Sequence, residues 1–102
     1  MHGIEIKILQ IRDIENCDYA FMNYHFAQRH GFSLDDYEEV YSFDYKPTHF
    51  VLGNYILDDI YEIFNVGNRP EDFTGHSLSV SDIIVKDGEM YYVDSIGFAK
   101  IG

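Results

Sequence analysis

The sequence predicts one α+β domain, spanning residues 1–102, with a mainly antiparallel sheet and about two main helices packed on it. Three patterns support this class. Apolar residues alternate near the N-terminus, a central segment has apolar residues at helical spacing, and two strand-like runs flank an Asp-Gly pair. With 102 residues, of which 46% are hydrophobic, one core can form without a metal or disulfides.

The N-terminal third begins with a strand pattern and continues with a helical one. Isoleucines at positions 4, 6 and 8 alternate with Glu5 and Lys7, which predicts a strand over 4–12 with one buried face. After a potential N-cap at Asn16, apolar residues recur at helical spacing and Gly31 follows, so a helix is predicted over 17–30. This helix would place Cys17, the single cysteine, in the core.

The middle of the chain is less regular. Ser33 and Asp36 resemble a capping pair, and residues 34–41 fit either a short helix, with its acidic residues on one face, or a strand. We expect a strand and a loop over 42–53. Residues 55–65 form a clear amphipathic helix pattern, with acidic residues opposite the apolar stripe.

The C-terminal third changes to a strand pattern. One helical turn is expected at 70–72. Strands are predicted over 80–85 and 90–94, because these runs flank Asp87-Gly88, a strong signal for a two-residue hairpin turn. A last short strand is expected over 98–101.

Net charge is the strongest functional signal. Eighteen acids and seven bases give a net charge of −11. Such a surface repels nucleic acid and anionic membranes, and it favours the basic clefts of proteins that bind nucleic acid. No apolar run has the length of a membrane span, and no signal-peptide pattern is present. We therefore expect a cytoplasmic protein that contacts neither membranes nor nucleic acid directly.

The acids concentrate in the middle of the chain, where eight acids and one base lie between positions 35 and 62. On a helix, like charges four residues apart repel each other. A surface selected only for solubility could intersperse charges of both signs at no such cost. A partner-binding face and a merely solvated face both remain open. The acidic set comprises Asp35, Asp36, Glu38, Glu39, Asp44, Asp58, Asp59 and Glu62.

No catalytic or metal-binding constellation stands out. A triad of His76 and Asp94 with Ser77, Ser79 or Ser81 would need an exposed nucleophile elbow, and the sequence has no such motif. The five histidines lack metal-ligand spacing, and no phosphate-binding glycine loop occurs. We expect no enzyme, no metal and no cofactor.

A longer motif in the C-terminal third is not explained by periodicity. Its parts are Pro70-Glu71-Asp72-Phe73, then Gly75-His76-Ser77-Leu78-Ser79-Val80-Ser81-Asp82, and then Tyr91-Tyr92-Val93-Asp94-Ser95-Ile96-Gly97-Phe98. It resembles the hallmark of the YodL-like domain family, closely over 57–98 and more loosely over 19–41. The resemblance implies a bacterial domain often carried by mobile elements, sometimes beside antirestriction domains, with no established catalytic role.

We expect the motif residues to be structural. Glycines would permit turns, and serines and aspartates would bind backbone groups where a strand begins. The residues are Pro70, Phe73, Gly75, His76, Ser77, Ser79, Ser81, Asp82, Asp94 and Gly97.

Charge and resemblance together predict a small non-enzymatic inhibitor that acts by binding a protein with a basic surface. Its most concrete form is a mobile-element anti-CRISPR or antirestriction protein. It would block the nucleic-acid channel of a host defence nuclease, such as a Cas nuclease or a restriction enzyme. The alternative is a YodL-like regulator or adaptor that binds a different bacterial protein without mimicking nucleic acid.

Overall fold

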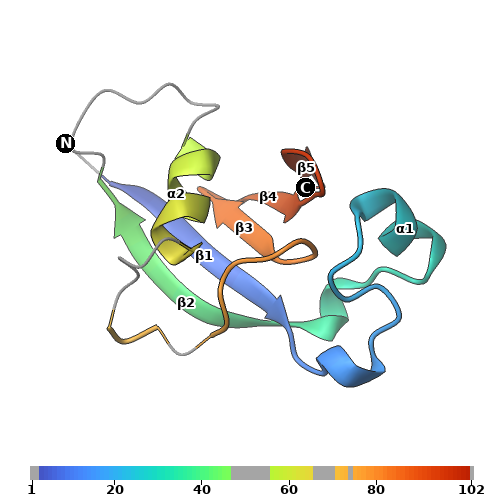
Figure 1. The fold of residues 1–102 in the computed structure, drawn as a ribbon. Helices are drawn as coiled ribbons and strands as arrows, with labels where there is room; N and C mark the ends of the chain where they lie inside the picture. Colours follow the sequence, from blue (N-terminus) through green and yellow to red (C-terminus); the bar gives the residue numbers. More distant parts are fainter. Residues whose placement is uncertain (1–2, 47–55, 66–70, 74, 102) are drawn as a thin grey trace.

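The computed structural model describes residues 3–46, 56–65, 71–73 and 75–101, and in these residues a five-stranded antiparallel sheet forms the centre of the molecule (Figure 1). The strands are β1 (Ile4–Ile11), β2 (Tyr37–Tyr45), β3 (Ile83–Lys86), β4 (Glu89–Val93) and β5 (Phe98–Lys100), in the spatial order β2-β1-β3-β4-β5. The described helices are α1 (Tyr24–Arg29) and α2 (Ile56–Asn65), with 3₁₀ turns η1 (Ile14–Asn16) and η2 (Leu34–Asp36). The α+β prediction is confirmed.

Side-chain alternation along the strands divides the apolar residues into two cores. Ile8 of β1 belongs to a core with Phe64 of α2, on one face of the sheet. Ile11 belongs to a second core with Tyr19 and with Ala27 of α1, on the other face. The central strand β3 contributes to both cores, so the sheet is the middle of three layers.

The hairpin between β3 and β4 is confirmed. Asp87 and Gly88 have φ values of 48° and 86°, as a type I′ turn requires at both central positions. The Asp87 carboxylate accepts a hydrogen bond from the backbone N–H of Glu5 at 3.0 Å. The backbone N–H of Asp87 in turn donates to the Glu5 carbonyl at 2.9 Å, which attaches the turn to β1.

The first half of the predicted helix over 17–30 is wrong. The helix starts only at Tyr24, and its N-cap is Asn23, whose side chain accepts from the backbone N–H of Phe26 at 2.8 Å. Asn16 belongs to η1 instead, and Cys17, outside any helix, is half-buried beside the second core. At the other end the prediction holds. Gly31 has φ 83° and follows the last helical turn.

Long-range hydrogen bonds explain why residues 17–22 are not helical. The backbone N–H of Phe21 donates to Ser81 Oγ at 2.8 Å, and the Met22 carbonyl accepts from the Tyr92 hydroxyl at 2.7 Å. Phe21 also has φ 65°, outside the right-handed helical region. Tertiary contacts therefore override the helical apolar spacing of this segment.

For residues 34–41 the helical interpretation is wrong and the strand alternative is largely right. The Ser33 side chain accepts from the backbone N–H of Asp35 at 3.2 Å and caps only the short turn η2. The chain then enters β2, where a bulge opposite Ile8 and Leu9 shifts the register. Beyond the bulge, Tyr41, Phe43 and Tyr45 face α2, because residues two apart on a strand share a face, whereas Tyr37 lies in the second core.

The other boundaries differ from the predictions by small amounts, apart from β3. The strand predicted over 80–85 starts at Ile83, because Ser81 has φ 84° and lies in a turn. The helix predicted over 55–65 is α2, and the last strand is β5. Residues 71–72 lie in a turn, whereas residues 47–53 and Pro70 are outside the described residues.

Candidate functional site

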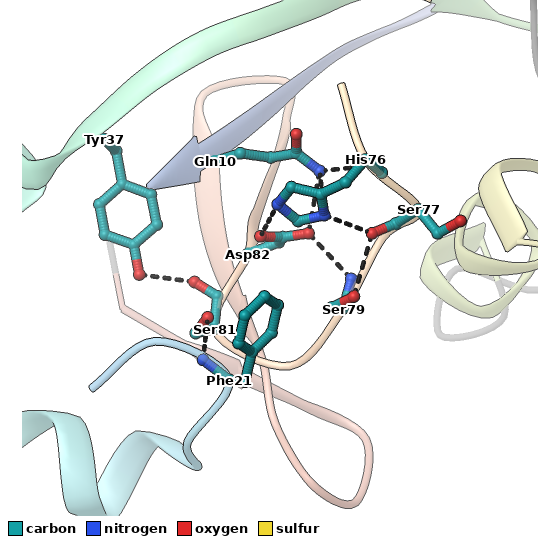
Figure 2. A network of polar contacts seen from close by, with 8 residues as sticks. All are labelled: Gln10, Phe21, Tyr37, His76, Ser77, Ser79, Ser81 and Asp82. Atoms are coloured by element: carbon teal, nitrogen blue, oxygen red, sulfur yellow. Dashed lines mark hydrogen bonds and ion pairs between the residues drawn. The ribbon is translucent and has the colours of Figure 1, made fainter. Parts of the chain in front are cut away.

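The family-like motif centres on a buried carboxylate. Asp82 is 1% exposed, and its Oδ2 accepts hydrogen bonds from the backbone N–H of Ser79 at 2.8 Å and from Gln10 Nε2 at 3.1 Å. His76 Nε2 lies 3.9 Å from Asp82 Oδ1 (Figure 2). We call Gln10, His76, Ser79 and Asp82 the Asp82 network. It joins β1 to the segment that precedes β3.

The hydrogen bonds of His76 define the orientation of its ring. Its Nδ1 lies 2.7 Å from the Ser77 carbonyl oxygen, which can only accept, so Nδ1 carries the proton and donates. Gln10 Nε2 consequently makes its hydrogen bonds to the His76 carbonyl, at 2.9 Å, and to Asp82. The Nε2 atom lies on the side of Asp82, and the contact of the ring with Ser77 is to its backbone carbonyl.

Burial changes the acidity of the central carboxyl group. Loss of solvation raises the pKa of Asp82 to about 7, and the Ser79 N–H, His76 and the Gln10 amide partly offset this rise. A carboxyl group with this pKa changes its protonation state near neutral pH, while its Oδ2 accepts two hydrogen bonds.

Ser81 connects this motif to two further segments. Its carbonyl accepts from the Tyr37 hydroxyl at 2.5 Å, and its hydroxyl accepts from the backbone N–H of Phe21 (Figure 2). Burial is the main cause that raises the pKa of Tyr37, so this hydroxyl remains a donor. The Phe21 ring is 50% exposed and lies 6.0 Å from the His76 ring, centroid to centroid.

The serine and glycine positions upstream of Asp82 act through close packing and local bonds. The Ser79 hydroxyl donates to the Ser77 carbonyl at 3.0 Å. A Cβ on Gly75 would lie 2.4 Å from Gln10 Oε1 and 2.7 Å from the Phe73 ring, so no larger residue fits without a shift. Phe73 itself packs edge-on against the ring of Phe64.

The second part of the motif forms the turn between β4 and β5. Asp94 Oδ1 accepts from the backbone N–H of Ser95 at 2.8 Å and from that of Tyr24, the first residue of α1, at 3.2 Å. Gly97 has φ 70°, and its carbonyl accepts from the Asp94 N–H at 3.1 Å. Asp94 thus connects the turn to α1.

The acidic set does not form one continuous face. Glu39 and Asp44 point away from α2. Glu39 forms an ion pair with Lys7 at 3.8 Å, and Asp44 lies opposite Glu5 in the register of β1 and β2. Asp58, Asp59 and Glu62 are on α2, which covers the opposite face of the sheet, and Asp35, Asp36 and Glu38 lie at the other end of β2 and in η2. Seven of the eight side chains are exposed, and Asp59 is half-buried.

Two members of the acidic set are hydrogen-bonded to tyrosines. Asp36 accepts from the Tyr19 hydroxyl at 2.6 Å, and Asp59 accepts from the Tyr45 hydroxyl. Burial, followed by the bond to Asp59, raises the pKa of Tyr45 to about 12. These carboxylates help to anchor the core, in addition to any role at the surface.

Among the hollows on the surface of the described residues, two involve acidic residues. One, of about 380 Å³, is lined by four aspartates that include Asp35 and Asp36, together with Tyr19 and His30. The other, of about 230 Å³, lies between α2 and the β4–β5 turn. Both bring together residues that are distant in the sequence.

Sequence reasoning missed Gln10, Tyr37 and Phe21 as partners of the motif. For Gln10 a signal was available. It continues the alternation of Ile4, Ile6 and Ile8, so its amide had to point inward and needed buried partners. No local pattern indicates the hydroxyl of Tyr37 or the backbone of Phe21, because their bonds span 44 and 60 residues.

The described residues contain no group of three potential metal ligands, and none of their helices has the length and apolar character to cross a membrane. The described residues form a three-layer α+β domain. In it, residues of the C-terminal motif make hydrogen bonds to turns in the N-terminal third of the chain. The family model of the YodL-like domain matches residues 5–102, so the chain belongs to the YodL-like domain family. A search of curated proteins and a search of solved structures each found no match.

Proposed function

We propose that this protein is a non-enzymatic inhibitor that binds the basic nucleic-acid channel of a host defence nuclease, as an anti-CRISPR or antirestriction protein. The observation that carries the proposal is uncompensated surface charge. Of the eighteen carboxylates, all of them in described residues, three have a lysine partner within the described part of the chain. These three are Glu5, Glu39 and Glu89.

The amount of charge is comparable with that of nucleic acid. The molecule is 40 Å long and carries a net charge of −11. Duplex DNA of that length carries roughly two dozen phosphates, at one charge per ~1.7 Å. The protein therefore has about half the linear charge of a duplex, which suits binding in a channel lined by lysine and arginine.

The hydrogen bonds of the motif support a binding role over catalysis. The ring nitrogens of His76 are directed at the Ser77 carbonyl and at Asp82. The backbone N–H of Ser79 is directed at Asp82 as well. N–H groups that already donate to acceptors within the fold are not positioned to stabilise charge on a reacting substrate.

One observation favours a second function, that of an adaptor with an apolar interface. Phe21 is 50% exposed and Ile96 is 92% exposed. Both residues are held in defined turns by the motif, through Ser81 and Asp94 respectively. Such residues at a rigid surface are typical anchors of protein interfaces.

Salt dependence separates the two functions. Purified protein is tested against a panel of Cas nucleases and restriction enzymes for inhibition of DNA cleavage and for direct binding, at low and at high salt. We expect inhibition of a panel member, relief by added competitor DNA, and a dissociation constant that increases steeply with salt. Affinity that is independent of salt, with no competition by DNA, would favour the adaptor.

A further inference from the structure

The hollow of about 230 Å³ between α2 and the β4–β5 turn combines three kinds of lining. Val80 and Val93 supply aliphatic surface, and Tyr61 and Phe98 supply aromatic rings. The two rings meet edge to face, with their centroids 6.4 Å apart. Asp58 from α2 and Asp94 from the turn are the acidic residues of the lining.

We propose that this hollow receives an arginine side chain of the partner protein. The inference rests on the proposed function, because it assumes a partner with a basic surface. The planar guanidinium would lie against the ring of Tyr61 or Phe98 and donate paired hydrogen bonds to Asp58. Its methylene stem would cover the valines.

Charge and shape together select arginine over other occupants. The two acidic residues repel an anionic group, and a purely apolar side chain would cover the Asp58 carboxylate without offering it a hydrogen bond. A lysine ammonium can pair with a carboxylate but cannot donate in parallel while it stacks on a ring. Arginine satisfies the rings and the carboxylates at once.

The turn is preorganised for such a contact. The backbone N–H groups of Tyr24 and Ser95 fix the Asp94 carboxylate in place through its Oδ1. No described lysine or arginine forms an ion pair with either carboxylate of the hollow. Ile96 in the same turn is 92% exposed and would add an apolar contact beside the arginine.

An NMR titration of the intact ¹⁵N-labelled protein tests the inference without any nuclease. The probe is the peptide acetyl-Gly-Arg-Gly-amide, compared with the same peptide carrying lysine or citrulline. We expect arginine to bind tightest and citrulline weakest, with the largest shifts at Tyr61, Ser95, Gly97 and Phe98. Shifts of equal size for arginine and citrulline, no binding, or shifts centred elsewhere would overturn the assignment.

Two variants make the titration site-specific. Asp58→Asn should weaken binding of the arginine peptide by about fivefold, because it removes the charge but preserves the side-chain size. Glu15→Gln, which removes one exposed charge on η1 at the other face of the sheet, should leave it unchanged. Equal effects of the two variants would reduce the interaction to general charge attraction and overturn the proposal.

The outcomes distinguish this inference from the proposed function. Arginine binding in the hollow without inhibition of any panel nuclease would contradict the function and retain the site. Nuclease inhibition that Asp58→Asn leaves intact would contradict the arginine site and retain the proposed function. Concentration-dependent self-association that Asp58→Asn abolishes would assign the hollow to a second copy of this chain and overturn the partner.

Discussion

The backbone N–H of Phe21 donates to the hydroxyl of Ser81 at 2.8 Å, and both residues hold a positive φ, 65° and 84° respectively. Non-glycine residues avoid this backbone region unless their surroundings stabilise it. The Tyr37 hydroxyl binds the Ser81 carbonyl from the other side. The motif thus stabilises an otherwise unfavourable turn 60 residues away, and it holds the Phe21 ring at the surface.

Substitutions at Ser81 separate the hydrogen bond from the backbone strain. Ser81→Ala should lower the free energy of unfolding by about 1–3 kcal/mol, because the Phe21 N–H loses its partner. Ser81→Gly loses the same bond but tolerates the positive φ, so it should be more stable than Ser81→Ala by about 1 kcal/mol. Urea denaturation measures both values. Equal stability of the two variants would contradict a strained backbone at this position.

Asp82 should make stability depend on pH. Burial raises its pKa from 3.8 to about 7, so between these values the folded state binds a proton that the unfolded state does not. The stability that this group contributes is therefore present at low pH and is lost as the pH rises through this window. Asp82→Asn does not titrate, so its stability should decrease less than that of the wild type between pH 5 and pH 8.

Unfolding free energies of both proteins at the two pH values check this prediction. The surface carboxylates are common to both, so their titration cancels in the comparison. A difference between wild type and Asp82→Asn that is the same at pH 5 and at pH 8 would show that Asp82 keeps an ordinary acidity in the fold.

The sequence predicts those elements whose signals are local. The Asp87-Gly88 turn needs only its two residues, and α2 needs only its own apolar stripe. The helix over 17–30 failed because Phe21 and Met22 bond to side chains near the C-terminus. Local spacing contains no information on such partners.

The same limit applies to the candidate sites. The acidic residues were identified by composition. Their positions in the sequence could not show that those on α2 and the exposed ones on β2 lie on opposite faces of the sheet. Asp82 was identified as part of a motif, yet its hydrogen-bond partner Gln10 is 72 residues away. Only the pairing of β1 with β3 brings these two residues together.

The hairpin turn offers a second stability prediction. Gly88 has φ 86°, and a Cβ there would meet no atom within 4 Å, so a substitution acts through the backbone alone. Gly88→Val should lower the free energy of unfolding by about 1 kcal/mol or more, because a β-branched residue resists positive φ. Gly88→Asn should lower it by less, since asparagine tolerates this region. Similar thermal midpoints for valine and glycine would contradict the turn type.

Charge reversals on the two faces of the sheet test which face contacts the partner. Asp18 and Asp35 line the larger hollow, whereas Asp58 and Glu62 lie on α2, against the opposite face of the sheet. Reversing either pair to lysine adds four units and changes the net charge from −11 to −7. The two variants therefore lose long-range attraction to a basic channel about equally.

Only the variant whose reversed residues contact the partner should lose binding affinity beyond this shared effect. Because the reversed residues are exposed, the free energy of unfolding should change by at most ~1 kcal/mol in either variant. Calorimetry measures the affinity for the inhibited nuclease at low and at high salt. The affinities of the two variants should differ at both salt concentrations. If the arginine hollow is the docking site, the variant with Asp58 reversed should bind more weakly. Wild-type affinity of both variants at low salt would mean that the acids serve solubility alone.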